Sequence, residues 1–261
     1  MTLGRTNWTG VVFGLCLSFL AAFQLFKLPP VLPVLLEVYG HDRTLAGGFM
    51  SIYALAGLAL SVLIGRILEV RGPARPVLAA LALMIAGNLL VLLWPGQGLL
   101  VLGARALEGV AFAVLAIAGP TLANREASRH HLPLVIGLTA TWIPAGQLTA
   151  GLIAPVSVAL EAWQALWIVA LAATVLLGLW TVGLMAGGRV ELGARGAGDP
   201  HPTAARSLAG TVKVDLLLAA HLLWLMYEGV PRENPVSVSR VPPAESTANA
   251  IPKSATTTSP A

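Results

Sequence analysis

Six apolar runs, each long enough to cross a bilayer as a helix, constrain this chain more than any other feature. They cover residues 11–36, 45–64, 77–94, 98–123, 133–160 and 164–186. Spanning about 30 Å of hydrocarbon takes about 20 helical residues. Only 11% of the residues are charged and 56% are hydrophobic, whereas soluble domains carry about 25% charged residues. The sequence therefore predicts an all-α membrane protein with a six-helix transmembrane domain over residues 1–186.

Prolines occur inside several of these runs. They are Pro29, Pro30, Pro33, Pro120, Pro144 and Pro155. Membrane helices tolerate proline because neighbouring helices and local adjustments satisfy the freed backbone groups. We therefore expect kinks in the helices rather than helix ends.

The cations between the runs predict an orientation. If the chain starts inside, ten cations fall on the inner side: Arg5, Arg66, Arg71, Arg75, Arg125, Arg129, Arg189, Arg195, Arg206 and Lys213. The opposite loops contain only Arg43. Because Lys and Arg accumulate in cytoplasmic loops, we expect a cytoplasmic (inner) membrane protein whose N-terminus and tail are both cytoplasmic.

The composition changes after the sixth run. Residues 187–213 are rich in Gly, Ala and Arg, which is typical of a flexible cytoplasmic linker. Residues 214–228 contain an apolar stretch shorter than the about 20 residues a span needs, so we interpret them as a truncated, partial seventh helix. Residues 229–261 are mostly Pro, Ser, Thr and Ala without apolar periodicity, and we expect disorder there.

A weak internal repeat relates the first three runs to the second three. An offset of 89 residues aligns Gly48 and Gly57 with Gly137 and Gly146, and an aromatic position recurs between them. Weak internal symmetry of this kind is typical of secondary transporters. The repeat predicts a 3+3 arrangement of helices.

Two motifs add a family resemblance. Residues 65–75 are similar to the G-x-x-x-[D/E]-R-x-G-R-[R/K] loop of the major facilitator superfamily, with Gly65, Glu69 and Gly72 in register and Arg71 and Arg75 at shifted positions. Val70, Pro73 and Ala74 depart from the pattern. The fourth run resembles the family's R-x-x-x-G-x-x-x-A pattern from Arg105 to Ala113. The resemblance implies half of a twelve-helix fold, and residues 133–151 are similar to cyanate and nitroimidazole permease-like members.

Charged residues inside the spans are the main candidates for substrate binding. A charge at the bilayer centre costs about 2.5–3.5 kcal/mol on insertion scales, so such residues usually face a cavity or a partner. Lys27 and Arg105 lie about 13 and 10 Å from the outer ends of their helices at about 1.5 Å per residue. Glu108 follows Arg105 by three residues and shares its helix face. We expect that pair to neutralise itself and Lys27 to favour an anionic solute. In the alternative interpretation Lys27 snorkels to the outer interface and Arg105 with Glu108 is a structural pair.

Tyr53, Trp142 and Gln147 are secondary candidates on the helices that the repeat relates. Packing or lipid-facing roles fit the two aromatic residues equally well, and Gln147 also fits a hydrogen bond to a neighbouring helix. The resemblance implies a gating role for Gly65, Glu69, Arg71, Gly72 and Arg75. The positive-inside bias alone would explain the arginines.

Several other functions find no support in the motifs. Neither G-x-x-x-x-G-K-[S/T] nor H-E-x-x-H occurs, so an ATP-driven pump, a zinc protease and a nucleotide cofactor are not indicated. His130 and His131 lack further ligands at metal spacing, and the cations are not clustered as in a nucleic-acid binder. We predict no enzyme activity, no metal, no cofactor and no nucleic-acid partner.

The sequence therefore predicts a secondary active transporter, in a truncated form, that moves a small molecule or ion across the lipid bilayer. An anionic solute is our hypothesis, because of Lys27. Alternating access needs a second wall, so we expect either a homodimer or a missing C-terminal half. The competing hypothesis is a non-transporting membrane protein, or an inactive fragment that acts at most as an assembly partner.

Overall fold

The computed structural model describes residues 5–188 and 190. The predicted partial seventh helix, the tail and nearly all of the linker lie outside the described residues. The elements are α1 (Trp8–Phe26), η1 (Pro29–Val31), α2 (Leu32–Tyr39), α3 (Arg43–Arg71), α4 (Ala74–Leu93), α5 (Gly98–Glu126), α6 (Leu132–Ala140), α7 (Trp142–Ala159) and α8 (Gln164–Gly187). They form six candidate spans, and these coincide with the six apolar runs. The all-α membrane fold is confirmed.

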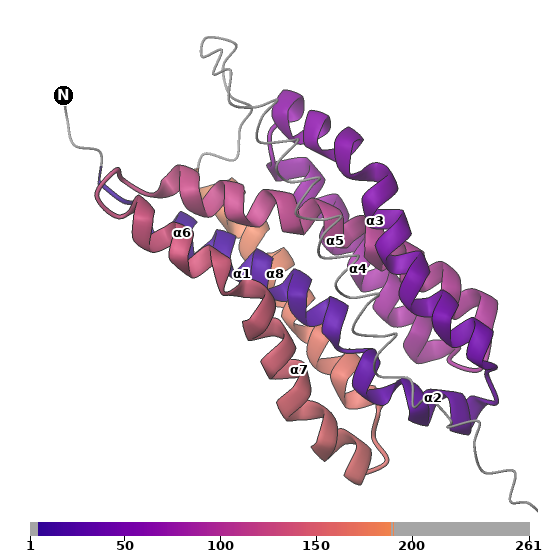
Figure 1. The fold of residues 1–261 in the computed structure, drawn as a ribbon. Coiled ribbons are helices and arrows are strands. Elements are labelled where there is room, and N and C mark those ends of the chain that lie inside the picture. The colour runs from indigo at the N-terminus through magenta and orange to yellow at the C-terminus, as the bar shows by residue number, and fades with distance from the viewer. Residues whose placement is uncertain (1–4, 189, 191–261) are drawn as a thin grey trace, which may run out of the picture. The chain divides into compact units, whose positions relative to one another are not determined.

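Helix α5 is the centre of the packing. It contacts α1, α3 and α4 extensively, and α1 packs in turn against α7. Figure 1 shows α3 on one side of the α1 and α5 pair and α7 on the other. Helix α8 lies against α4. The first and fourth spans are therefore the best placed to carry buried side chains.

Two glycines that the repeat aligns occupy equivalent helix crossings. A Cβ atom on Gly57 of α3 would lie 3.0 Å from the carbonyl oxygen of Gly109 on α5. A Cβ atom on Gly146 of α7 would lie 2.7 Å from the backbone nitrogen of Phe23 on α1. Small residues let membrane helices approach closely. The crossings of α3 with α5 and of α7 with α1 thus match the 3+3 pattern.

At two places the prolines end a helix rather than only kinking it. Pro29 and Pro30 cannot donate to the carbonyls of Leu25 and Phe26, so α1 ends at Phe26 and a 3-10 turn leads into α2. Pro144 likewise cannot donate to Ala140, and the fifth span is divided there into α6 and α7. The expectation of kinks without helix ends was wrong at both positions. Pro120 and Pro155 do lie inside continuous helices.

The predicted gating segment is mostly helical rather than a loop. Residues 65–71 complete α3, which ends at Arg71 with Gly72 as its C-cap, and α4 begins at Ala74. Gly72 has a φ of +74°, a conformation that glycine adopts without steric cost. The side chains of Glu69, Arg71 and Arg75 are exposed. Among the described residues, no hydrogen bond or ion pair involves these three side chains, so their predicted gating role stays a prediction.

Large apolar side chains cover the outer faces of the helices. Leu55 on α3, Leu148 and Leu152 on α7, and Leu176 and Leu179 on α8 are each more than half exposed. Exposed apolar surface of this extent needs a lipid or protein neighbour. The outer faces therefore fit a bilayer.

Candidate functional site

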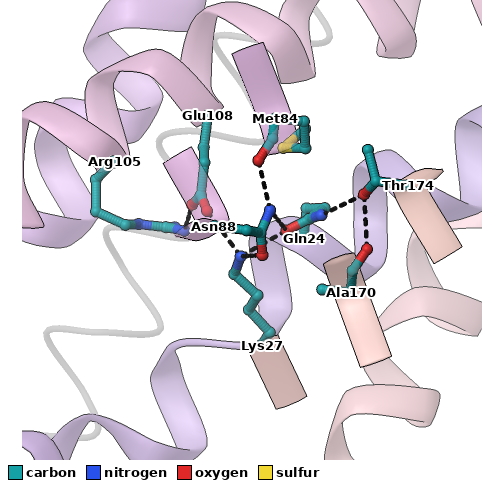
Figure 2. A network of polar contacts seen from close by, with 8 residues as sticks. All are labelled: Gln24, Lys27, Met84, Asn88, Arg105, Glu108, Ala170 and Thr174. Atoms are coloured by element: carbon teal, nitrogen blue, oxygen red, sulfur yellow. Dashed lines mark hydrogen bonds and ion pairs between the residues drawn. The ribbon is translucent and has the colours of Figure 1, made fainter. Parts of the chain in front are cut away.

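Lys27 lies where α1 is interrupted. It is the C-cap residue of α1, and its N–H donates to the carbonyl of Phe23 at 3.0 Å. The last carbonyls of a helix carry partial negative charge, so a cation is favourable there. The side chain has no exposed surface, and Figure 2 shows it directed toward Asn88 and Glu108. Snorkelling of Lys27 to the outer interface is thus not observed.

The Lys27 ammonium has a hydrogen-bond partner for each of its three protons. Its Nζ donates to Gln24 Oε1 at 2.6 Å, to Asn88 Oδ1 at 2.7 Å and to Glu108 Oε1 at 2.8 Å. These partners come from α1, α4 and α5. An ammonium group can donate three hydrogen bonds and accept none. Lys27 is therefore fully satisfied without any ligand.

Glu108 bridges the two buried cations. Its Oε1 forms the ion pair with Lys27, and its Oε2 pairs with Arg105 Nη1. All three side chains have no exposed surface. The pairing of Arg105 with Glu108 is the one expected from their spacing. The expectation that this pair neutralises itself and leaves Lys27 as the unpaired cation was wrong, because Lys27 shares the same carboxylate.

The network continues through residues that the sequence analysis did not select. Asn88 Nδ2 donates to the Met84 carbonyl at 2.7 Å, and Gln24 Nε2 donates to Thr174 Oγ1 at 3.0 Å. Figure 2 shows these groups around Lys27. Gln24 and Asn88 are buried. Both are amide side chains within apolar runs of the sequence, and this placement alone could have selected them. We call Gln24, Lys27, Asn88, Arg105, Glu108 and Thr174 the central charge cluster.

Aromatic rings cover both cations. Lys27 Nζ lies 4.8 Å from the ring centre of Trp167, and Arg105 Cζ lies 4.3 Å from that of Tyr53. Both distances fall within the range of attractive cation–π contacts. Within the described residues, Tyr53 Oη, Arg105 Nε and Arg105 Nη2 have no hydrogen-bond partner although they are buried. Trp167 Nε1, on the ring beside Lys27, also has no partner there. Of the two cations themselves, Arg105 has donors without a partner and Lys27 has none.

The remaining candidates divide into two groups. Tyr53 is next to Phe112, with ring centres 5.4 Å apart, and Phe112 stacks on Trp142 at 6.2 Å. We call Tyr53, Phe112 and Trp142 the aromatic row. The aromatic row extends from Arg105 to Trp142, which is half-buried at the start of α7. Gln147 is exposed on α7, and no hydrogen bond links it to the central charge cluster.

The cluster carries an excess of positive charge. Two cations share one carboxylate, and the remaining members are neutral. Buried charge is costly in a membrane span unless partners compensate it. Lys27, Arg105 and Glu108 together carry a formal charge of +1. Among residues 5–188 and 190, no group of His, Cys, Asp or Glu side chains could hold a metal ion.

Within the described residues, six apolar spans around a buried, charged centre define a polytopic membrane protein. The sequence model of the Major Facilitator Superfamily matches residues 14–234, so the chain belongs to this superfamily. No curated protein matches the chain significantly.

Solved transporters share the fold. A peptide transporter POT in complex with sulfate superposes with a TM-score of 0.63 at 18% identity, covering 88% of this chain and 48% of that one. A POT family transporter in complex with 5-aminolevulinic acid gives a TM-score of 0.60 at 15% identity, covering 87% of this chain and 48% of that one. The chain thus spans about half the length of these transporters. This likeness concerns the fold.

Proposed function

We propose that the chain forms one half of a secondary active transporter for a small anionic solute. One observation carries the proposal: a six-span member of this superfamily contains a fully buried cluster of two cations and one carboxylate. Ionisable groups inside spans usually mark a solute or ion pathway. The superfamily and its fold favour transport rather than enzyme activity. The proposed solute site then comprises Lys27, Arg105 and Glu108, with Tyr53, Trp142 and Gln147 in supporting roles.

The second half of the carrier would come from a second copy of this chain or from a C-terminal half. The support is the length of the solved transporters, of which this chain matches 48%. Crosslinking in native membranes separates the two sources. A crosslinked species of twice the chain's mass supports a homodimer, and a heavier species that contains a different polypeptide supports a separate half.

The finer assignments rest on the sequence. The Lys and Arg distribution supports an inner-membrane location with both ends of the six-span unit cytoplasmic, and residues 133–151 support a cyanate or nitroimidazole permease-like subtype. Labelling of single cysteines introduced at Arg43 and at Arg71, in a chain whose Cys16 is replaced by Ser, tests the orientation. We expect a membrane-impermeant reagent added outside to label only the cysteine at position 43.

Uptake of radiolabelled small anions into proteoliposomes, reconstituted with any partner half that crosslinking identifies, tests the activity. Lys27→Gln should abolish uptake, because it removes one of the two cations that share Glu108. Arg43→Gln is the matched control, since it also removes one cation but from an exposed position at the start of α3. Equal anion uptake by the Lys27→Gln variant and the unaltered protein would contradict the proposal.

A non-transporting role is the second candidate, and one observation favours it: the cluster has no exposed surface in this conformation. A closed cluster could simply hold α1, α4 and α5 together. In that case no anion would be taken up, and Lys27→Gln would change only the stability.

A further inference from the structure

We infer that Arg105, not Lys27, binds the solute, and that it recognises a planar oxyanion such as a carboxylate. This inference deepens the proposed function and rests on it for the role of the site. It names the class of ligand and the side chain that binds it. The evidence is the distribution of donors within the central charge cluster.

The two cations differ in whether any of their hydrogen-bond donors lacks a partner. Each proton of the Lys27 ammonium has an acceptor, at 2.6, 2.7 and 2.8 Å from Nζ. Arg105 uses Nη1 for Glu108, and its Nε and Nη2 have no partner within the described residues. A guanidinium has five donors and no acceptor. An additional anion therefore finds free donors on Arg105 and none on Lys27.

The free donors of Arg105 also have a defined geometry. The Nε–H and one N–H of Nη2 lie on the same edge of the planar guanidinium and point in parallel directions. Two parallel donors match the two oxygens of a carboxylate or a similar planar oxyanion. Glu108 occupies the Nη1 end, and the donors of this edge have no hydrogen-bond partner within the described residues. A spherical anion would use such an edge less well.

Charge supports the same assignment. Lys27 and Arg105 together exceed the charge of Glu108 by one. A monovalent anion on the free edge makes the cluster neutral, and neutrality lowers the cost of burial. Because Lys27 holds Glu108 Oε1 at 2.8 Å, Glu108 stays on the Nη1 side. Lys27 acts in this arrangement as a positioning residue.

The aromatic row lies between Arg105 and the half-buried start of α7. Tyr53 covers the guanidinium, and its hydroxyl is buried without a partner. The row then passes through half-buried Phe112 to half-buried Trp142. Movement of these rings would expose Arg105 without breaking the hydrogen bonds of Lys27. The Tyr53 hydroxyl would then be available as a further donor to the oxyanion.

Anion binding to the full chain in lipid nanodiscs tests this assignment. Formate is the planar probe and chloride the spherical one, at equal ionic strength, with tryptophan fluorescence as the readout because Trp167 lies beside Lys27 and Trp142 ends the aromatic row. Arg105→Lys keeps the charge but removes the parallel donors. We expect it to weaken formate binding about tenfold or more, as for loss of a hydrogen bond to a charged group, and to leave chloride binding nearly unchanged.

The control is Arg43→Lys, which makes the same change at an exposed position and should alter neither affinity. If Arg105→Lys does not fold, the unaltered protein decides, because the two parallel donors of Arg105 should make it bind formate about tenfold more tightly than chloride. Unchanged formate binding in folded Arg105→Lys, or equal affinity of the unaltered protein for both anions, would overturn the assignment.

The experiments can reject the Arg105 site and the proposed transport independently of each other. Formate binding without formate uptake into proteoliposomes would retain the Arg105 site and reject transport. Uptake of chloride without formate binding would retain anion transport and reject the site.

Discussion

Two polar regions of the molecule differ in which groups their hydrogen bonds satisfy. The first is the central charge cluster. The second joins the start of α1 to the end of α5 and the start of α6, and we call it the terminal clasp. Its members are Thr6, Asn7, Glu126, Ser128 and His131.

The terminal clasp satisfies backbone groups at helix ends. Asn7 caps α1, donates from its N–H to the Glu126 carbonyl at 2.9 Å and donates from Nδ2 to Glu126 Oε2 at 2.8 Å. Thr6 Oγ1 accepts from the Ser128 N–H at 3.0 Å and donates to Ser128 Oγ at 2.7 Å. These contacts are half-buried. Helix ends leave unpaired backbone groups that caps of this kind satisfy.

The central charge cluster has no such structural explanation. Its ionic contacts join side chain to side chain, it is fully buried, and it leaves donors of Arg105 unpaired. Replacing a buried ion pair by apolar residues of similar volume is often neutral or stabilising. A bundle that needed only stability would not require this cluster. The difference between the two regions therefore favours function at the centre and structure at the clasp.

Glu108→Gln should have the largest effect on stability. It leaves Lys27 and Arg105 buried without a counter-charge, and removing one partner of a buried pair costs about 3–5 kcal/mol. SDS-induced unfolding in mixed micelles, followed by tryptophan fluorescence, measures the loss. Glu126→Gln is the matched control in the terminal clasp and should lower the free energy of unfolding by less than about 1 kcal/mol. The contact of Glu126 with Asn7 is partly solvated, and the Gln amide oxygen can still accept from Asn7. Equal losses would remove the distinction between the two regions.

Gly87→Ala should have a smaller effect on the central cluster. A Cβ atom at Gly87 would lie 2.6 Å from Glu108 Cγ and 3.0 Å from the Ala104 carbonyl oxygen. Glu108 cannot swing away, since both of its oxygens are held by cations. Overpacking of this kind costs about 1–3 kcal/mol, which outweighs the gain of about 1 kcal/mol from replacing Gly by Ala in a helix.

Unfolding in mixed micelles measures the Gly87→Ala effect. Gly103→Ala on α5 is a control, because nothing lies within 4 Å of its Cβ position. A Gly87→Ala variant as stable as Gly103→Ala would show that Glu108 is free to move.

The sequence predicted the spans well and the site only in part. Apolar runs long enough to cross a bilayer have few alternative folds, so the six spans follow from composition alone. The spacing of three residues between Arg105 and Glu108 predicts a pair within one helix. Lys27 is 81 residues from Glu108, and its contact depends on how α1 ends at Pro29 and packs against α5. No local pattern could predict that contact.

Gly10→Ala should have the smallest effect, because it makes the corresponding change in the terminal clasp. A Cβ atom at Gly10 would lie 2.5 Å from Glu126 Cγ and 3.0 Å from Glu126 Oε2, with no backbone atom among its nearest neighbours. Glu126 is half-buried and can rotate toward solvent. The loss of its hydrogen bond to Asn7, about 1 kcal/mol, is offset by the similar gain in helix propensity. We expect the midpoint of SDS unfolding to stay nearly unchanged. A loss as large as that of Gly87→Ala would mean that Glu126 is held as firmly as Glu108, and the clasp would then need a role beyond capping.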